Sequence, residues 1–426
     1  MVALLKTDSQ QIGKFRAQRY VLENGLTLIH QQIPAAPVVT LDVWVKAGAM
    51  VEPDEWSGMA HFLEHMIFKG TDRLPPGCFD QVIENRGGVT NAATSHDYAH
   101  FFINTAAADL PETLPYLAEL LLNAAIPDEE FGLERDVVLE EIRQSFDDPD
   151  SLGFQALMEM VYQCHPYGRS VLGNAASLLE RSPEEMRSFH RAHYQPENMT
   201  VVVVGDVSAE TTLDLVQTHF KTFANRTACP ILQVEAEPPL IGIRRQELHL
   251  SLIGQARLMM AWVGPGVEDL RSAYGLDLLS VMLAGGRTSR LVRELREERQ
   301  LVQDVVSGFS LQRDSSLFTI SAWLDAAHLD QVEAIVGDRL AQLAATPVSE
   351  TELQRYKRLL RNDYAFSTET TSQLAGLYGY YNTIAEAELS AIYADVIQSF
   401  HAEELQRLAS RCLSPLHYAV TILKPC

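Results

Sequence analysis

The chain has 426 residues, of which 46% are hydrophobic and 21% charged, and its formal net charge at pH 7 is −22. This length predicts at least two domains, each with enough apolar material for a core, and the composition is that of an ordinary globular protein. The negative charge excludes nucleic-acid binding through the overall field of the protein and favours basic partners, including peptides rich in lysine and arginine.

The N-terminal stretch MVALLKTDSQQIGKF has an apolar run that ends at Lys6, which is too short for the core of a signal peptide. No run of about 18 apolar residues occurs, so we expect no membrane span. The 5 cysteines are widely separated and form no Cys-x-x-Cys pair, which favours reduced thiols. The sequence therefore predicts a protein of the bacterial cytoplasm, or a mature chain that has already been processed.

The two halves of the chain show the same order of predicted elements. Each half begins with two β-rich segments, continues into long helical stretches and closes with a further strand. In the first half the strands are predicted at 25–32, 38–48 and 198–207. In the second half they are predicted at 247–254, 256–264 and 417–425. The likeness lies in the order of elements rather than in residue identity.

Residues 225–243, NRTACPILQVEAEPPLIGI, lie between these halves. Their prolines and acidic residues suit a linker better than a helix or a central strand. The sequence thus predicts an α+β protein with an N-terminal domain over 1–224, this linker, and a structurally similar C-terminal domain over 244–426. In each domain we expect an antiparallel-rich sheet flanked by helices.

Residues 57–71, SGMAHFLEHMIFKGT, contain the pattern His-x-x-Glu-His within a predicted helix over 59–67. On one face of this helix, at 3.6 residues per turn, fall the apolar residues Met59, Phe62, Leu63, Met66 and Ile67. His61, Glu64 and His65 fall on the opposite face. The two imidazoles should therefore project together, with Glu64 beside them.

Two histidines four positions apart on one helix face can bind a single ion, and zinc readily accepts imidazole. A third protein ligand would leave one position for water, close to Glu64 as a general base. The alternative is that His61, Glu64 and His65 form the solvated face of a surface helix. A third ligand and a substrate-binding element would decide between the two.

The third ligand is expected to be a carboxylate on a separate element. Residues 127–146 predict a helix whose first turn is rich in acidic residues. Glu134 and Glu141 lie seven positions apart and hence on one face, whereas Glu140 is rotated by about 100° from Glu141. Spacing does not choose among these acids, and a solvated acidic helix is the simpler interpretation of the segment by itself.

The motif belongs to a longer series of stretches: HFLEHMIFKGT (61–71), GGVTNAATSHDYAHFF (87–102), ERDVVLEEI (134–142), HPYGRSVLG (165–173), YQPENMTVVVVGD (194–206) and AGGRTSRLVRELREER (284–299). In order and spacing this series resembles the pitrilysin family of zinc peptidases with an inverted zinc motif. The nearest likeness is to the β-subunit of mitochondrial processing peptidase and its single-chain bacterial relatives. The resemblance covers nearly the whole chain and implies two similar α+β domains that form half of a clam-shell chamber.

The resemblance also implies the roles of individual residues. It makes His61, His65 and Glu141 the ligands of one zinc ion per chain, and Glu64 the general base. It makes Glu134 a second acid that supports the site. The family pattern thus selects Glu141, which spacing alone does not.

A substrate-binding element is predicted at residues 89–105, which are rich in β-prone residues and follow two glycines. The resemblance implies that the first strand of this pair is an exposed edge to which an extended peptide adds as a further strand. Asn91 and Ala92 match positions that contact substrate. Main-chain pairing of this kind makes little demand on the peptide sequence. The alternative for Asn91 is that it only shapes a turn.

One departure from the family pattern concerns an arginine and a tyrosine seven residues apart in the second domain, which contact substrate in members that complete their own active site. Here Arg296 is present, but Gln303 stands at the tyrosine position. We therefore expect a heterodimer in which a zinc-less homologue supplies both groups, with a homodimer as the rival. A surface ion pair is the alternative role for Arg296.

The sequence predicts a zinc-dependent endopeptidase or oligopeptidase that cleaves extended peptides, as the catalytic subunit of a dimer. The alternatives are a non-catalytic core subunit of the same family and a module that binds peptides without cutting them. A nucleotide enzyme is disfavoured, because no phosphate-binding loop pattern occurs around Gly285 and Gly286.

Overall fold

The computed structural model of the protein describes residues 5–6, 15–223, 228–230, 234–251 and 253–426. It divides the chain into two compact units, each of which takes a segment from the opposite half of the chain. The first unit consists of Met1–Arg143, Ser170–Gln233 and Phe366–Ile392, and the second of Gln144–Arg169, Val234–Ala365 and Tyr393–Cys426. The predicted domain boundaries at 224 and 244 stay a prediction, and part of the predicted linker, 225–227 and 231–233, lies outside the described residues.

The first unit is built on a mixed sheet with the spatial order β1-β2-β3-β7-β4-β6-β5. Its strands span Leu5–Lys6 (β1), Gln18–Val21 (β2), Thr27–Gln32 (β3), Val38–Val45 (β4), Val89–Thr94 (β5), Ala99–Ala106 (β6) and Met199–Gly205 (β7). β3 and β7 are parallel, and the other neighbouring pairs are antiparallel. Among the described strands, β5 has a neighbour on one side only and so forms an edge of the sheet.

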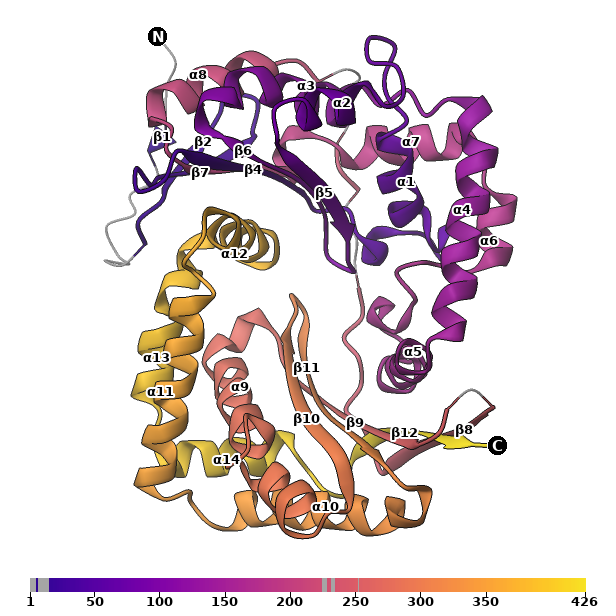
Figure 1. The fold of residues 1–426 in the computed structure, drawn as a ribbon, viewed down its shortest axis with the longest axis vertical. Coiled ribbons are helices and arrows are strands. Elements are labelled where there is room, and N and C mark those ends of the chain that lie inside the picture. Colours follow the sequence, from indigo (N-terminus) through magenta and orange to yellow (C-terminus); the bar gives the residue numbers. More distant parts are fainter. Residues whose placement is uncertain (1–4, 7–14, 224–227, 231–233, 252) are drawn as a thin grey trace. The chain divides into compact units, whose positions relative to one another are not determined.

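The helices of this first unit are α1 (Met59–Ile67), α2 (Cys78–Glu84), α3 (Leu110–Asn123), most of α4 (Asp128–Asp147), α6 (Ala175–Glu180), α7 (Pro183–His193), α8 (Ala209–His219) and α12 (Thr371–Ile384). Of these, α3 and α8 cover one face of the sheet and α12 covers the other (Figure 1). The main core, which includes Leu41, Phe62 and Leu117, lies on the face covered by α3 and α8. The opposite face packs Trp44 and Val202 against α12, which comes from the second half of the chain.

The second unit has a five-stranded sheet with the order β10-β11-β9-β12-β8. Its strands span Ile243–Leu250 (β8), Ala256–Pro265 (β9), Val302–Leu311 (β10), Ser315–Leu324 (β11) and Tyr418–Pro425 (β12). β8 and β12 are parallel, and the other neighbouring pairs are antiparallel. This order matches β5-β6-β4-β7-β3 of the first sheet strand for strand, so the structure confirms two similar α+β units.

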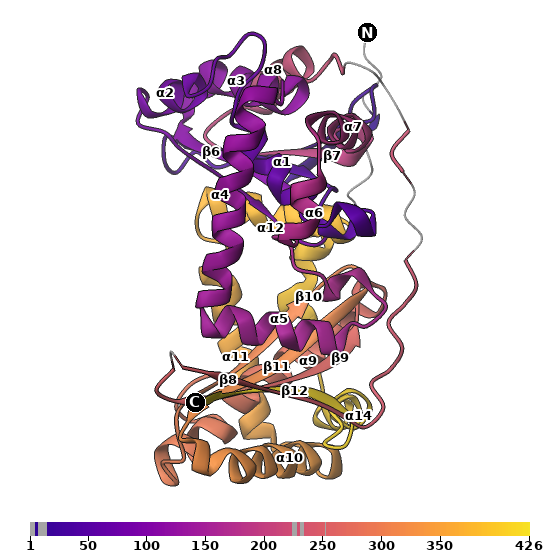
Figure 2. The same cartoon turned by 90° about the vertical axis from the view of Figure 1, so that its right-hand side faces the viewer.

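Helices also lie on both faces of the second sheet. They are α5 (Pro149–Val161), α9 (Leu270–Ala284), the π-helix η7 (Val292–Glu298), α10 (Leu329–Ala345), α11 (Glu350–Phe366), α13 (Tyr393–Ser399) and α14 (Ala402–Cys412). Figure 2 shows the sheet between α5 on one side and α10 on the other. α5 packs on β8, β9 and β12 although it comes from the first half of the chain. It therefore occupies in this unit the place that α12 occupies in the first.

Most predicted elements are found within a few residues of their expected positions. The predicted helix over 59–67 is α1 itself, and the strand pair predicted within 89–105 is β5 and β6. The strand predicted at 247–254 is wrong in position, because β8 begins at Ile243 and ends at Leu250. Its first residues, Ile243-Arg-Arg-Gln, are polar enough to suggest a loop, yet they alternate in exposure as a strand at a sheet edge does.

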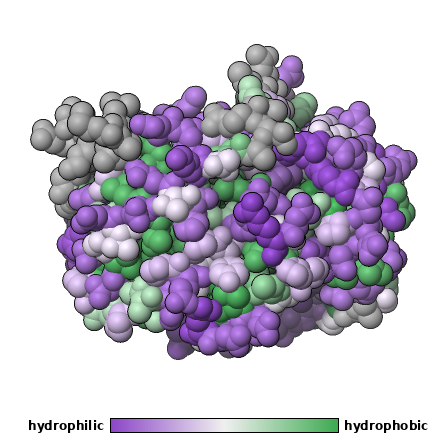
Figure 3. Space-filling view, turned by 90° about the horizontal axis from the view of Figure 1, so that it is seen from above, coloured by the Kyte–Doolittle hydropathy of each residue, from purple (hydrophilic) through white to green (hydrophobic). Residues whose placement is uncertain are grey.

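None of the helices in the described part of the chain combines the length and the apolar character that a membrane crossing requires. The view from above in Figure 3 shows mostly hydrophilic side chains with smaller hydrophobic areas between them. This surface is the one expected for amphipathic helices that turn their apolar faces toward a sheet.

Candidate metal centre

The candidate site is built on α1, whose first turn is anchored by a buried carboxylate. Glu52 is 2% exposed and accepts hydrogen bonds from the backbone N–H groups of Gly58 (2.9 Å) and Ala60 (2.7 Å). The N-terminal turn of a helix has unpaired N–H groups and a positive end of the helix dipole, so a carboxylate is a favourable partner there. Glu52 thus fixes where the helix begins and how its faces are turned.

The apolar face of α1 packs into the main core, and its polar face carries the motif. Met59, Phe62 and Leu63 are fully buried. The side chains of His61 and His65 are 12% and 18% exposed, so both rings are largely covered but accessible at one edge. The rings stand at 70° to each other with their centroids 4.8 Å apart, which lets their Nε2 atoms turn toward a common point.

The third member of the cluster is Glu141 of α4. Its Oε2 atom lies 3.6 Å from Nε2 of His61 and 3.5 Å from Nε2 of His65. One ligand atom from each of these residues lies within 4.8 Å of the others, an arrangement that could hold a metal ion. In a tetrahedral site with zinc–ligand bonds of about 2.0–2.1 Å, ligand atoms are about 3.4 Å apart. The three residues therefore fit zinc in number, chemistry and spacing.

Glu140, the alternative that spacing left open, points elsewhere. Its side chain is 54% exposed and pairs with Arg143 at 2.9 Å on the outer side of α4. The rotation of about 100° between neighbouring residues of a helix separates Glu140 from the histidines and turns Glu141 toward them.

Glu134 lies two helical turns before Glu141 on α4 and contacts the Nδ1 side of the His65 ring. Its Oε1 atom lies 2.9 Å from Nδ1 of His65, and its Oε2 atom lies 2.5 Å from Nζ of Lys69. Burial alone would raise the pKa of Glu134, but the hydrogen bonds from Lys69 and His65 outweigh burial and lower it. A carboxylate that accepts the Nδ1 proton of a histidine leaves Nε2 free as a metal ligand. Glu134 thus has the geometry of a supporting acid.

His61 is suited to metal binding by its protonation state. Burial and the neighbouring His65 lower the pKa of His61 to about 4, so its imidazole is neutral at pH 7. Its Nδ1 atom is buried and has no hydrogen-bond partner among the described residues. Neutral imidazole is the form that binds metal ions.

Glu64 lies between the histidines and the edge strand β5. Thr94, the last residue of β5, donates a hydrogen bond of 2.5 Å to Oε2 of Glu64. Burial raises the pKa of Glu64, while the Thr94 hydrogen bond and the charge of His65 act in the opposite direction. This contact ties the candidate base directly to the strand that is predicted to bind substrate.

The predicted substrate residues lie on the same strand. Asn91 and Ala92 are in the middle of β5, opposite Phe102 and Phe101 of β6. Asn91 is exposed, and its side chain accepts a hydrogen bond from the N–H group of Ala92 at 2.9 Å. The structure thus brings His61, Glu64, His65, Glu134 and Glu141 together and places β5 beside them.

Arg296 belongs to the second unit and forms ion pairs there. Its guanidinium contacts Asp304 at 2.9 Å and Glu297 at 3.0 Å. Gln303 is exposed at the start of β10. These contacts match the surface ion pair that is the alternative role for Arg296, and its contact with substrate stays a prediction.

Sequence reasoning missed three residues that shape the site. Lys69 lies two residues beyond the end of α1, so the helical spacing of the motif does not reach it. Thr94 lies within the stretch that carries the resemblance, but no local pattern relates it to Glu64. Glu52 lies outside the helix that it anchors, and an acidic residue shortly before a helix is too common to single out.

Comparison with known proteins gives two matches to one family. Residues 27–175 match the family described as Insulinase (Peptidase family M16), and residues 181–360 match the Peptidase M16 inactive domain. The first match contains the candidate metal centre, and the second contains β8 to β11. A relative from Helicobacter pylori, described as zinc protease PqqE, is 28% identical over 409 residues, which cover 95% of this chain and 92% of the relative.

Solved structures give the same result. A protease from Helicobacter pylori has a TM-score of 0.89 at 28% identity, and the match covers 96% of this chain and 99% of that one. A peptidase M16 inactive domain from Pseudomonas fluorescens has a TM-score of 0.86 at 21% identity, with 97% and 99% covered. Both are similar to this chain over nearly their whole length.

Proposed function

The chain belongs to the peptidase M16 family, and we propose that it is a zinc-dependent endopeptidase or oligopeptidase. The observation that carries this proposal is the convergence of His61, His65 and Glu141 on one point, with Glu64 beside them. A solvated helix face has no need for a third ligand on another helix or for a buried acid. The name of the Helicobacter pylori relative, a zinc protease, supports the choice of metal.

His61, His65 and Glu141 would hold the zinc ion, which when bound supplies Lewis-acid activation of water and of the scissile carbonyl. Glu64 moves the proton: its carboxylate accepts a proton from the attacking water and passes it to the nitrogen of the leaving amine. Thr94 engages Oε2 of Glu64, which leaves Oε1 for this proton. Burial raises the pKa of Glu64 and so brings it closer to the pH at which the transfer occurs.

The peptide substrate is proposed to lie along β5 as an additional strand. β5 is an edge among the described strands, and its residues alternate in exposure. An edge strand offers unpaired backbone groups, which bind an extended peptide with little dependence on its sequence. Asn91 and Ala92 would contact the peptide. The net charge of −22 favours basic peptides.

We further propose that the chain works as the zinc-bearing subunit of a heterodimer, with a homodimer as the rival. The support is Gln303, which replaces the tyrosine expected seven residues after Arg296. A zinc-less homologue would then supply an arginine and a tyrosine from its own chain. Location in the bacterial cytoplasm is likewise part of the proposal.

The test is the zinc content and peptidase activity of the purified chain, with a quenched basic peptide as substrate. We expect one zinc ion per chain, which is lost in the His65→Ala variant and retained in a matched variant, His401→Ala, at an exposed position of the second unit. Strong cleavage by the chain alone would favour the homodimer, and weak cleavage with full zinc content would favour the heterodimer. A chain that binds no zinc would refute the proposed activity and favour a non-catalytic core subunit.

A further inference from the structure

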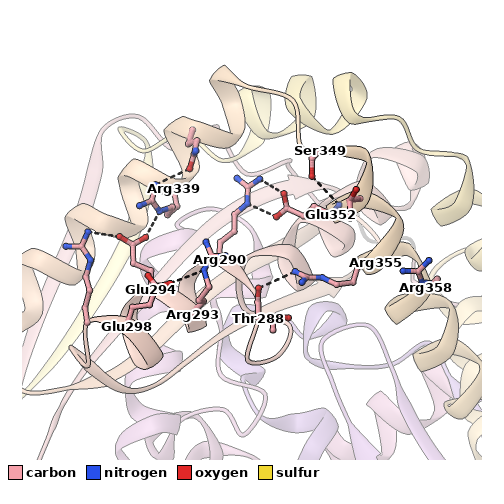
Figure 4. A pocket seen from close by; sticks show the side chains of 13 residues that line it. Thr288, Arg290, Arg293, Glu294, Glu298, Arg339, Ser349, Glu352, Arg355 and Arg358 are labelled. Carbon is pink, nitrogen blue, oxygen red and sulfur yellow. Dashed lines mark hydrogen bonds and ion pairs between the residues drawn. The ribbon is translucent and has the colours of Figure 1, made fainter.

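The second unit contains a pocket that plays no part in the proposed metal centre. Its walls come from the segment around Thr288, from η7, from the C-terminal half of α10 and from the first turns of α11 (Figure 4). Its volume is about 880 Å³. All of its lining residues belong to one compact unit, so the pocket does not depend on how the two units are placed.

The pocket, which we call the arginine pocket, is lined by an unusual number of guanidinium groups for so acidic a chain. Its arginines are Arg290, Arg293, Arg299, Arg339, Arg355 and Arg358. Its acidic residues are Glu294, Glu298 and Glu352, so six positive charges face three negative ones and leave a local charge of +3. The whole chain has a net charge of −22, and a positive cavity in such a protein attracts anions against the overall field.

Ion pairs fix the floor of the pocket. Glu294 is 6% exposed and is shared by Arg339 at 2.5 Å and Arg299 at 2.8 Å. Arg290 forms two parallel hydrogen bonds of 2.8 Å with the two carboxylate oxygens of Glu352. Bidentate pairs of this kind hold both side chains in one geometry. The floor is therefore a preformed surface rather than a set of loose side chains.

Two arginines of the rim have no carboxylate partner in an ion pair within the part of the chain that is described. Arg355 lies over the ring of Tyr356 and donates hydrogen bonds to the Tyr356 hydroxyl (2.6 Å) and to the carbonyl oxygen of Thr288 (3.2 Å). Arg358 follows one turn later on α11, and Figure 4 draws no interaction for it. Arg299 and Arg339 share one carboxylate, that of Glu294. These three residues together therefore carry the third uncompensated positive charge.

The backbone at this place is also unusual. η7 is a π-helix, in which the N–H of Arg299 bonds to the carbonyl oxygen of Glu294, five residues earlier. π-turns are rare and occur frequently at functional sites. Here the wider turn allows Arg293, Glu294, Glu298 and Arg299 to face one cavity, whereas the tighter α-helix would spread them around its circumference.

We propose that the arginine pocket binds a polyanion of linked phosphate groups, such as inorganic tripolyphosphate or the triphosphate of a nucleotide. Guanidinium groups match phosphate oxygens in geometry and bind them through paired, charge-assisted hydrogen bonds. The volume exceeds the need of a single phosphate. The lining has neither aromatic nor apolar side chains, so a nucleobase finds no stacking surface, and the phosphate chain itself is what the pocket recognises.

The experiment is isothermal titration calorimetry of the full chain with sodium tripolyphosphate, after a high-salt wash that removes bound anions. We expect saturable binding that weakens as the salt concentration rises, because exposed guanidinium groups are screened. The Arg355→Gln and Arg358→Gln variants should each weaken binding about tenfold or more. Arg361→Gln is the matched control, since it removes the same charge from α11 at an exposed position outside the pocket and should leave binding unchanged.

Weaker binding could also result from a variant that fails to fold. A variant that is expected to bind more tightly does not have this ambiguity. Glu298 pairs loosely with Arg293 at 3.4 Å, and both side chains are about 60% exposed. The Glu298→Gln change frees Arg293 and should strengthen tripolyphosphate binding several-fold. ATP should bind about as tightly as tripolyphosphate, and orthophosphate more weakly. Absence of tripolyphosphate binding, equal losses in the Arg358→Gln and Arg361→Gln variants, or preference for a hexaglutamate peptide would each overturn the proposal.

Discussion

The two units share one scaffold but place different chemistry on it. The second of the five matching strands is β4 in the first unit and β9 in the second. In both units, the first α-helix after this strand, α1 or α9, packs against the sheet. In both, a long helix follows the edge hairpin and one further helix, as α4 and α11. The side chains of these matching helices therefore account for part of what distinguishes the units.

The matching helices differ in charge. α1 carries His61, Glu64 and His65, and α4 turns Glu134 and Glu141 toward them. α9 has no histidine, and α11 turns Arg355 and Arg358 toward η7 instead. One copy of the scaffold thus gathers acids around imidazoles, and the other gathers guanidinium groups around a cavity. The comparison indicates that matching helices of one scaffold can carry different polar groups and hence different chemistry.

Each first helix nevertheless carries one partly buried carboxylate whose pKa is raised by desolvation. Glu64 on α1 accepts a hydrogen bond from the Thr94 hydroxyl, and Asp277 on α9 accepts one from the Tyr393 hydroxyl. In the first unit, histidines surround Glu64. In the second unit, aromatic rings pack beside Asp277, and the ring centroids of Tyr274 and Tyr393 are 4.8 Å apart. We infer that the first acid is kept for chemistry and that the second only reduces stability.

The largest effect is expected for Glu64→Gln, which keeps the volume of the side chain but removes the proton acceptor. General acid–base catalysis contributes about 10²- to 10⁴-fold, so kcat should fall by about that factor. Zinc content should stay at the wild-type level, because Glu64 is not one of the three converging ligands. Metal analysis and a peptidase assay on the same sample check both statements. Unchanged turnover would mean that the chain binds peptides by another route or that another residue is the base.

The second prediction concerns Asp277→Asn. Burial raises the pKa of Asp277 from 3.8 to about 6, a difference that corresponds to about 3 kcal/mol. The wild-type protein therefore loses stability as pH rises from 3.8 through about 6, and the loss is constant above that range. The variant avoids this loss, and its amide oxygen can still accept the hydrogen bond from Tyr393. Its free energy of unfolding should exceed the wild-type value by up to about 3 kcal/mol at pH 8 and by less than about 1 kcal/mol near pH 4.

Urea unfolding at a series of pH values measures this difference directly. A variant that is less stable than the wild type at pH 8 would contradict the inference and would assign a structural or functional role to the Asp277 carboxylate. The matched control is Asp330→Asn in the first turn of α10, which makes the same change of charge at an exposed position.

The third prediction concerns α5 and α12, each of which packs on a sheet formed mainly by the other half of the chain. A Cβ atom at Gly379 of α12 would lie 2.1 Å from Nε1 of Trp44, a large and buried ring. A Cβ atom at Gly153 of α5 would lie 2.9 Å from Sδ of Met259, whose flexible side chain can move aside. Gly379→Ala should therefore cost about 3 kcal/mol of stability. Gly153→Ala should change it by less than about 1 kcal/mol, because alanine also favours the helix.

Thermal unfolding of both variants tests this contrast, with the wild type measured alongside. If Gly379→Ala were tolerated as well as Gly153→Ala, α12 would not be held against the first sheet as closely as Trp44 requires. The prediction thus probes the packing of an element on a sheet that belongs to the other half of the sequence.

The exchange of α5 and α12 also marks the limit of what the sequence could reveal about the fold. The strands and α1 follow from hydrophobic period and composition, which are local properties. α12 covers β4 and β7, which lie more than 160 residues away in sequence. No local sequence pattern predicts this tertiary contact. Polar residues at the start of β8 hid the beginning of that strand for a related reason, since an edge strand depends on its neighbour more than on its own sequence.

The candidate site divides in the same way. The spacing of His61 and His65 predicts their convergence, because both lie on one helix. The choice of Glu141 over Glu140 depends on how α4 is rotated against α1, and only the family resemblance gave it beforehand. Thr94 lies 30 residues from Glu64 and reaches it only because β5 packs beside α1, so a three-dimensional arrangement was needed to find it.

The smallest effect is expected at Thr94, which acts as a positioning residue through Glu64. Thr94→Val removes the hydroxyl at nearly constant volume, so the Glu64 carboxylate loses the donor that fixes Oε2. A hydrogen bond to a charged group is worth about 1.5–3 kcal/mol, and its loss should lower kcat about tenfold or somewhat more. KM should change little, because the backbone of β5 would still pair with the peptide. Thr94→Ser restores the hydroxyl and should recover most of the wild-type kcat.

The division between kcat and KM gives the Thr94 experiment its meaning. A variant that merely disturbs β5 would raise KM and would not be rescued by serine, because the strand rather than the hydroxyl would be at fault. Tyr393→Phe is the counterpart in the second unit, where it removes the hydroxyl that donates to Asp277. It should leave kcat and KM unchanged, since the acid beside it takes no part in the reaction. If both changes lowered kcat alike, the inference that Glu64 takes part in the reaction and Asp277 does not would be wrong.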